Sequence, residues 1–116
     1  MAKREPLSIR PENWQDDIGI RGLRVAARGI LFELLLVMHQ SCRRGYLVFD
    51  TATAVPDSDL HKLARCSPDQ CEKALDDMLR AGVLRRGDDG TVCCAWMVRE
   101  EQQKHLDSLP HPSGRI

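Results

Sequence analysis

Residues 57–82 carry the strongest local pattern of the sequence, two short amphipathic segments separated by a tight turn. The second segment begins with Ser67-Pro68-Asp69-Gln70. This order predicts a capping box, with serine at the N-cap, proline at the first helical position and glutamine at the third. We expect this helix to cover residues 68–81 and to end at Gly82, because glycine readily adopts the left-handed conformation that terminates helices.

The first segment of the pair predicts a shorter helix. Asp57 or Ser58 can cap it, and its helical spacing would bury Leu60, Leu63 and Ala64. A turn of roughly two to four residues joins the two helices, which is typical of a helix-turn-helix pair.

A long apolar helix is expected over residues 21–40, before this pair. Phe32, Leu36 and Val37 widen its apolar stripe, so we expect the helix to be largely buried at the centre of the domain. Gly29 costs up to about 1 kcal/mol in a helix interior, which predicts that another backbone approaches it closely. The residues expected to face the core are Leu23, Ala27, Ile30, Leu31, Leu34, Leu35 and Met38.

A β-hairpin is expected after Gly82. Asp89-Gly90 favours a tight hairpin turn between the β-rich runs 83–86 and 91–97, and residues 46–49 predict a further short strand. The predicted fold is therefore mainly α with a small β-hairpin (α+β). It would have an N-terminal arm (1–20) anchored by Trp14, one compact domain (21–98), and a C-terminal polar helix with a loose tail (99–116).

A family resemblance rests on seven segments of this sequence. They are Leu23-Arg24-Val25-Ala26-Ala27-Arg28-Gly29-Ile30-Leu31, Leu36-Val37-Met38-His39-Gln40, Arg43-Arg44-Gly45-Tyr46-Leu47, Asp59-Leu60-His61-Lys62-Leu63-Ala64-Arg65-Cys66-Ser67-Pro68-Asp69, Ala81-Gly82-Val83-Leu84, Asp89-Gly90 and Met97-Val98-Arg99-Glu100. Together they resemble phage and prophage replication-associated winged-helix proteins. The resemblance implies a winged helix-turn-helix over residues 21–98, and DNA binding in replication initiation or transcriptional regulation.

Two arginine pairs and one helix are the candidate nucleic-acid contacts. The 17 basic residues are balanced by 17 acidic ones, so a phosphate-binding surface requires that charge be segregated by face. In a winged helix the hairpin and the end of the first helix would hold the phosphates of double-stranded DNA, and the helix after the turn would lie nearest the bases. The candidate residues are Arg85, Arg86, Arg43, Arg44, Lys73 and Gln70.

The outward face of the helix 68–81 supports an alternative. Four of its side chains, Asp69, Glu72, Asp76 and Asp77, are acidic and would be repelled by a phosphate-lined groove. A protein-interaction module would instead use them to bind or inhibit a basic host or replication protein. A plain solvated helix face is the third interpretation of the same pattern.

The sequence shows no motif for catalysis, for cofactor or metal binding, or for crossing a membrane. We expect no enzyme, cofactor or metal site, because no nucleophile–base pair or phosphate loop is visible and the cysteine spacing does not suit zinc. The odd number of cysteines predicts free thiols. No apolar run has membrane-spanning length and no leader is visible, so a cytoplasmic protein without membrane contact is expected. The C-terminal helix is a possible homodimer contact.

Overall fold

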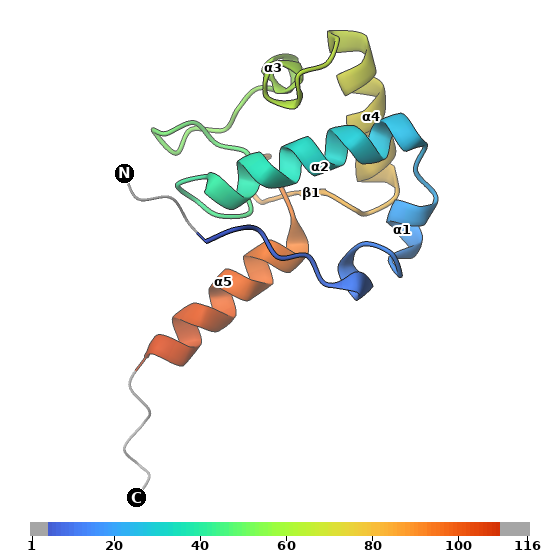
Figure 1. Ribbon diagram of the computed structural model, residues 1–116. Coiled ribbons are helices and arrows are strands. Elements are labelled where there is room, and N and C mark those ends of the chain that lie inside the picture. The colour runs from blue at the N-terminus through green and yellow to red at the C-terminus, as the bar shows by residue number, and fades with distance from the viewer. Residues whose placement is uncertain (1–4, 110–116) are drawn as a thin grey trace, which may run out of the picture.

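The computed structural model describes residues 5–109, which form a mainly helical body with a small antiparallel hairpin (Figure 1). No helix in this part of the chain combines the length and hydrophobicity needed to cross a bilayer. The elements are η1 (Pro11–Asn13), α1 (Ile18–Arg21), α2 (Val25–Gln40), η2 (Asp57–Asp59), α3 (Leu60–Ala64), α4 (Pro68–Arg80), β1 (Arg85–Arg86), β2 (Val92–Cys93) and α5 (Ala95–Ser108).

The expected helix 21–40 begins four residues later than predicted. α2 starts only at Val25, because Arg24 is extended, with φ −66° and ψ 155°. Arg21 instead ends the separate short helix α1, whose C-cap is Gly22. Ile20 in α1 is buried in the core. The expected boundary between arm and domain, at residue 20, therefore falls inside a helix that belongs to the packed body.

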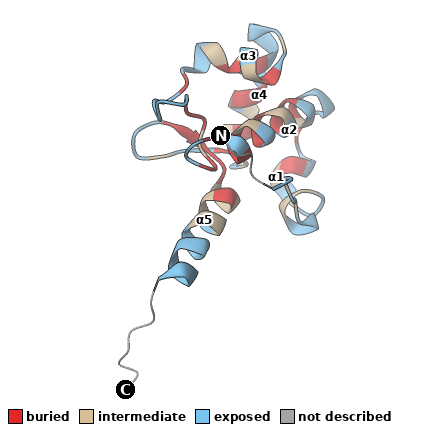
Figure 2. Ribbon diagram, turned by 60° about the vertical axis from the view of Figure 1, so that its left-hand side comes forward, coloured by how far each residue is buried: buried red, intermediate tan, exposed pale blue. Residues whose placement is uncertain are grey.

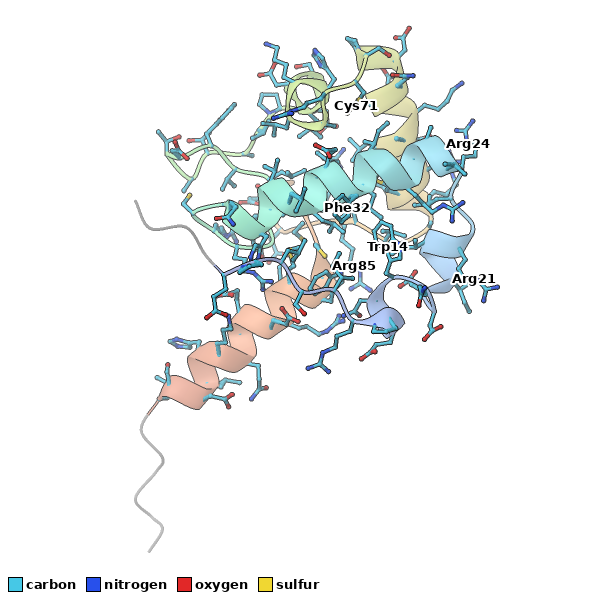
Figure 3. The ribbon with its side chains drawn as sticks, viewed as in Figure 1. Trp14, Arg21, Arg24, Phe32, Cys71 and Arg85 are labelled. Carbon is cyan, nitrogen blue, oxygen red and sulfur yellow. The ribbon has the colours of Figure 1, made fainter. Side chains whose placement is uncertain are left out.

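The inner side of α2 forms the core against α3 and α4. All seven residues that the sequence assigned to the core are buried; six of them lie on α2 and confirm its helical phase, and Leu23 lies just before the helix. The opposite side is exposed at Val25, Phe32 and Leu36, so the expectation of a largely buried helix is wrong for that face. No other segment of the described chain makes the close approach expected at Gly29, since a Cβ there would meet nothing within 4 Å. Trp14 anchors the arm edge-on to Phe32, with ring centroids 6.1 Å apart (Figure 3).

Two helices joined by a tight turn, α3 and α4, lie where the sequence predicts a helix pair. Arg65 adopts the left-handed conformation at the end of α3, with φ 59°, and Ser67 begins α4. The capping box is confirmed: the backbone N–H of Gln70 donates to Ser67 Oγ, and that of Ser67 donates to Gln70 Oε1, each at 3.2 Å. The expected cap of α3 is wrong, because residues 57–59 form η2 and no side chain caps either element.

The hairpin forms where the sequence predicts it. Arg85 pairs with Cys93 and Arg86 with Val92, around a turn in which Gly90 has φ +83°. The segment 45–48 lies on the other side of β2, because the Leu47 N–H donates to Val92 O at 2.9 Å and the Cys94 N–H to Gly45 O at 2.8 Å. Backbone hydrogen bonds therefore join this segment to the two-stranded hairpin, although it forms only an isolated bridge there.

α5 begins earlier than expected. Residues 95–97, expected in a strand, form its first turn, and Met97 is fully buried there. The later turns are exposed, so the helix extends away from the body (Figure 2). The expected boundary at residue 98 thus falls within α5, and the prolines and glycine of the expected tail lie outside the described residues.

Candidate functional site

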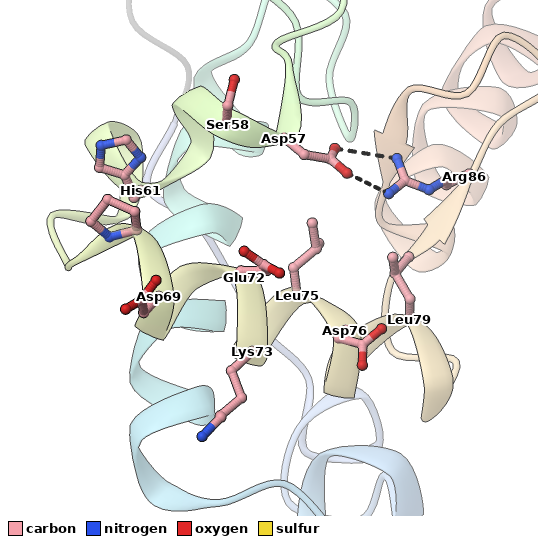
Figure 4. A pocket seen from close by; sticks show the side chains of 11 residues that line it. Asp57, Ser58, His61, Asp69, Glu72, Lys73, Leu75, Asp76, Leu79 and Arg86 are labelled. Carbon is pink, nitrogen blue, oxygen red and sulfur yellow. Dashed lines mark hydrogen bonds and ion pairs between the residues drawn. The ribbon is translucent and has the colours of Figure 1, made fainter.

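A groove of about 800 Å³ lies between η2, α3, α4 and β1 (Figure 4). Leu75 and Leu79 supply apolar surface along α4. Asp69, Glu72 and Asp76 line the groove from the same helix. Their spacing of three and four residues places these carboxylates on one stripe, because such residues are neighbours on a helix surface. The groove thus combines an apolar strip with an acidic rim.

The hairpin side of this groove is closed by an ion pair. Arg86 donates from Nη2 to Asp57 Oδ2 at 2.7 Å and from Nη1 to Asp57 Oδ1 at 3.3 Å (Figure 4). The hydrogen bond to Asp57 raises the pKa of Arg86 further above its ordinary value. Both planar groups are engaged in this forked contact, so Asp57 offsets the charge of Arg86 at the groove wall, although both side chains remain about half exposed.

The remaining charges leave the groove acidic. Four carboxylates line it against two basic side chains, Lys73 and Arg86, and Arg86 is already paired. Gln70 is held in the capping box through its side-chain oxygen. Two of the candidates for nucleic-acid contact line the groove, Lys73 and Arg86. Lys73 is the one of these two that forms no ion pair within residues 5–109, and it stands among Asp69, Glu72 and Asp76.

Asp77 lies outside this acidic stripe. It bonds to Arg24 at 2.7 Å, at the start of α2, and lines a different hollow. The hydrogen bond to Arg24 lowers the pKa of Asp77 below its usual range. Asp76 is also paired, with Arg80 on its own helix, but both side chains are well exposed and such pairs bind weakly. Asp77 thus joins α4 to α2, whereas Asp76 stays available at the groove.

The outer face of the hairpin is basic. Arg85 and Tyr46 both pair with Cys93, so these three side chains project from the same face of the sheet. Arg43 lies over the Tyr46 ring, 3.6 Å from its centroid, and reaches Asp89 at 3.4 Å. Burial raises the pKa of the Cys93 thiol, and the nearby Arg43 and Arg85 oppose that rise. Arg85 and Arg86, adjacent in sequence, thus serve opposite faces.

Arg44 has an interior role, which corrects its expected place on a phosphate-binding surface. Its side chain is only 5% exposed and donates from Nε to His39 Nδ1 at 3.0 Å. Its Nη1 reaches Glu100 at 3.1 Å and Glu101 at 3.4 Å. The His39 ring in turn bonds to the backbone oxygen of Glu5 at 2.6 Å. Arg44 therefore ties α2, α5 and the arm together and is not accessible to DNA.

Two of the buried thiols, those of Cys71 and Cys94, are structural in character. All five cysteines are free, and burial raises the pKa of Cys71 and of Cys94 to about 11. Such thiols are protonated at neutral pH and are poor nucleophiles. Within residues 5–109 no group of three or more His, Cys, Asp or Glu side chains is arranged to hold a metal ion.

Sequence reasoning missed Asp57 as a groove residue. It assigned Asp57 to a helix cap, whereas the structure pairs it with Arg86, 29 positions away. No local pattern signals such a pair, because it depends on how the hairpin packs beside η2. Comparisons with protein-family models, with curated proteins and with solved structures found no match for this chain.

Proposed function

We propose that this chain is a winged-helix interaction module whose acidic groove binds a basic, amphipathic segment of another protein. The order of α2, the 45–48 segment, α3, α4 and the β1–β2 hairpin supports the winged-helix assignment. The acidic stripe Asp69, Glu72 and Asp76 beside Leu75 and Leu79 carries the functional proposal. A peptide helix with an apolar side and lysines or arginines at its edges matches both features.

The same stripe disfavours DNA reading by α4. In a helix-turn-helix the second helix enters a groove lined by phosphates, where Asp69, Glu72 and Asp76 would be repelled. Lys73 is the one uncommitted cation of the groove lining, and Arg86 is held by Asp57. Electrostatic complementarity therefore favours a positively charged protein partner.

Neutralising the acidic stripe should abolish most of this binding. The probe is a fluorescein-labelled peptide of about 14 residues built from Lys, Leu and Ala, with leucines at helical spacing. We expect D69N/E72Q/D76N to lose about tenfold in affinity, a difference of about 1.4 kcal/mol, when binding is followed by fluorescence anisotropy at low salt.

A matched variant separates site binding from general charge attraction. E12Q/D50N/D107N removes the same charge from exposed positions on other elements. This control should bind within about twofold of the unsubstituted chain. Equal losses in the two triple variants would reject the groove as the binding site.

A second candidate function, nucleic-acid contact through the outer hairpin face, is favoured by the joint placement of Arg43 and Arg85 near Cys93. If it holds, R43Q/R85Q should weaken binding to a duplex of about 20 base pairs and reduce the slope of log affinity against log salt by about 2. R21Q/K62Q, with the same charge loss at other exposed positions, is the control. Identical salt slopes for both variants would exclude this face.

A further inference from the structure

The outer side of α2 is an apolar surface that stays exposed over most of its length in the described part of the chain, with Trp14 packed against Phe32. Val25 is 76% exposed, Phe32 42% and Leu36 39%. Together with Gly29, these three residues recur at intervals of four, three and four residues. This is the spacing of the residues that form the contact line, or seam, of a two-stranded coiled coil. A helix that is hydrophobic around most of its circumference is normally buried on all sides. α2 is such a helix, and its remaining side faces solvent.

Gly29 lies in the middle of this seam. A Cβ at this position would meet nothing within 4 Å, so packing within the chain does not require glycine. Glycine in a helix interior costs about 1 kcal/mol relative to alanine. Close approach by a second helix would account for its place, because small residues allow helix backbones to come near one another.

The flanks of the seam carry opposite charges five residues apart. Arg28 lies on one flank and Glu33 on the other, and neither side chain forms a hydrogen bond or ion pair within residues 5–109. Arg28 Nε is moreover buried without a hydrogen-bond partner, which is costly for a donor on a charged group. With Gly29 at the a position, Arg28 takes the g position and Glu33 the e position, the pair that a parallel coiled coil joins between chains.

We infer that α2 pairs in parallel with α2 of a second copy of this chain. Val25, Gly29, Phe32 and Leu36 form the seam, and Arg28 faces Glu33 of the second copy on each side. Trp14 packs edge-on against Phe32, a member of the seam, and supports that side chain (Figure 3). This surface is separate from the acidic groove, and it replaces the expected dimer contact through α5.

The association is tested by sedimentation equilibrium of the full chain at concentrations up to about 200 µM. We expect a monomer–dimer equilibrium that V25D and F32D each weaken at least tenfold. Val25 is so exposed that V25D should leave thermal unfolding unchanged at protein concentrations low enough for the chain to be monomeric, which distinguishes lost pairing from lost folding. F49D is the matched control for F32D, since Phe49 is 44% exposed on another segment.

A charge exchange tests the register. R28E and E33R should each weaken association, and the double variant R28E/E33R should restore it, because the pair is re-formed with its charges exchanged. L106D tests α5, where Leu106 is 59% exposed, and should leave association unchanged. Three results would each overturn the inference: a monomer at every concentration, failure of the double variant to recover, or dissociation by L106D but not by V25D. D69N/E72Q/D76N should dimerise normally. Failure of the proposed peptide binding at the groove can therefore be distinguished from failure of the inferred dimer at the seam.

Discussion

Replacing Gly45 with alanine is expected to lower the free energy of unfolding by about 3 kcal/mol. Gly45 has φ +95°, a conformation that costs a residue with a Cβ about 1–2 kcal/mol. The added Cβ would also lie 3.0 Å from Val98 Cγ2 and 3.2 Å from Met97 Cβ, at the start of α5. Overpacking of this kind typically costs about 1–3 kcal/mol more. Urea unfolding followed by circular dichroism measures the loss.

Gly82→Ala is the matched control for this substitution. Gly82 also has a positive φ, +76°, but a Cβ there would meet nothing within 4 Å. It should therefore cost only the conformational part, about 1–2 kcal/mol. If the two variants are equally stable, the close packing of α5 against the 45–48 segment is not the reason that position 45 requires glycine.

Replacing Arg44 with alanine is expected to cost about 2–3 kcal/mol. The substitution removes the hydrogen bonds that Arg44 donates to His39 Nδ1 and to the carbonyl of Met97, and it removes the cation between Glu100 and Glu101. Breaking a fully buried ion pair typically costs about 3–5 kcal/mol. The expected loss is smaller here because the two carboxylates are more than one-third exposed and water can solvate them.

Arg43→Ala tests whether the loss is specific to the buried arginine. Arg43 is the preceding residue, but its side chain is 46% exposed and its ion pair with Asp89 is long. It should cost less than about 1 kcal/mol. A loss at Arg44 no larger than that at Arg43 would show that the Arg44 network does not hold α5 to the body.

The elements governed by local chemistry were predicted well from the sequence. Ser67 and Gln70 fix the start of α4, and Gly82 and Gly90 mark turns whose positive φ suits glycine. The break between α1 and α2 was missed, because the apolar phase runs through Leu23 and Ala27 without interruption. The early start of α5 was missed because residues 95–97 continue the β-prone run of β2 without a break in composition.

The candidate surfaces were predicted by residue type but not by arrangement. Helical spacing correctly indicated an acidic stripe on α4 at Asp69, Glu72 and Asp76. It could not show that Arg86 pairs with Asp57 or that Arg44 is buried against α5, since both depend on contacts between distant elements. Alternation along a strand does separate Arg85 from Arg86, and that signal was available in the sequence.

The location of the bound peptide tests the central claim most directly. The same Lys/Leu/Ala peptide is titrated into the isotope-labelled full chain, and amide signals are followed by two-dimensional NMR. We predict that the shifted signals come from residues 57–61, the groove face of α4 and β1, and that duplex DNA leaves these signals unchanged. Shifts spread over unrelated surfaces, or shifts of α4 caused by DNA rather than by the peptide, would contradict the account.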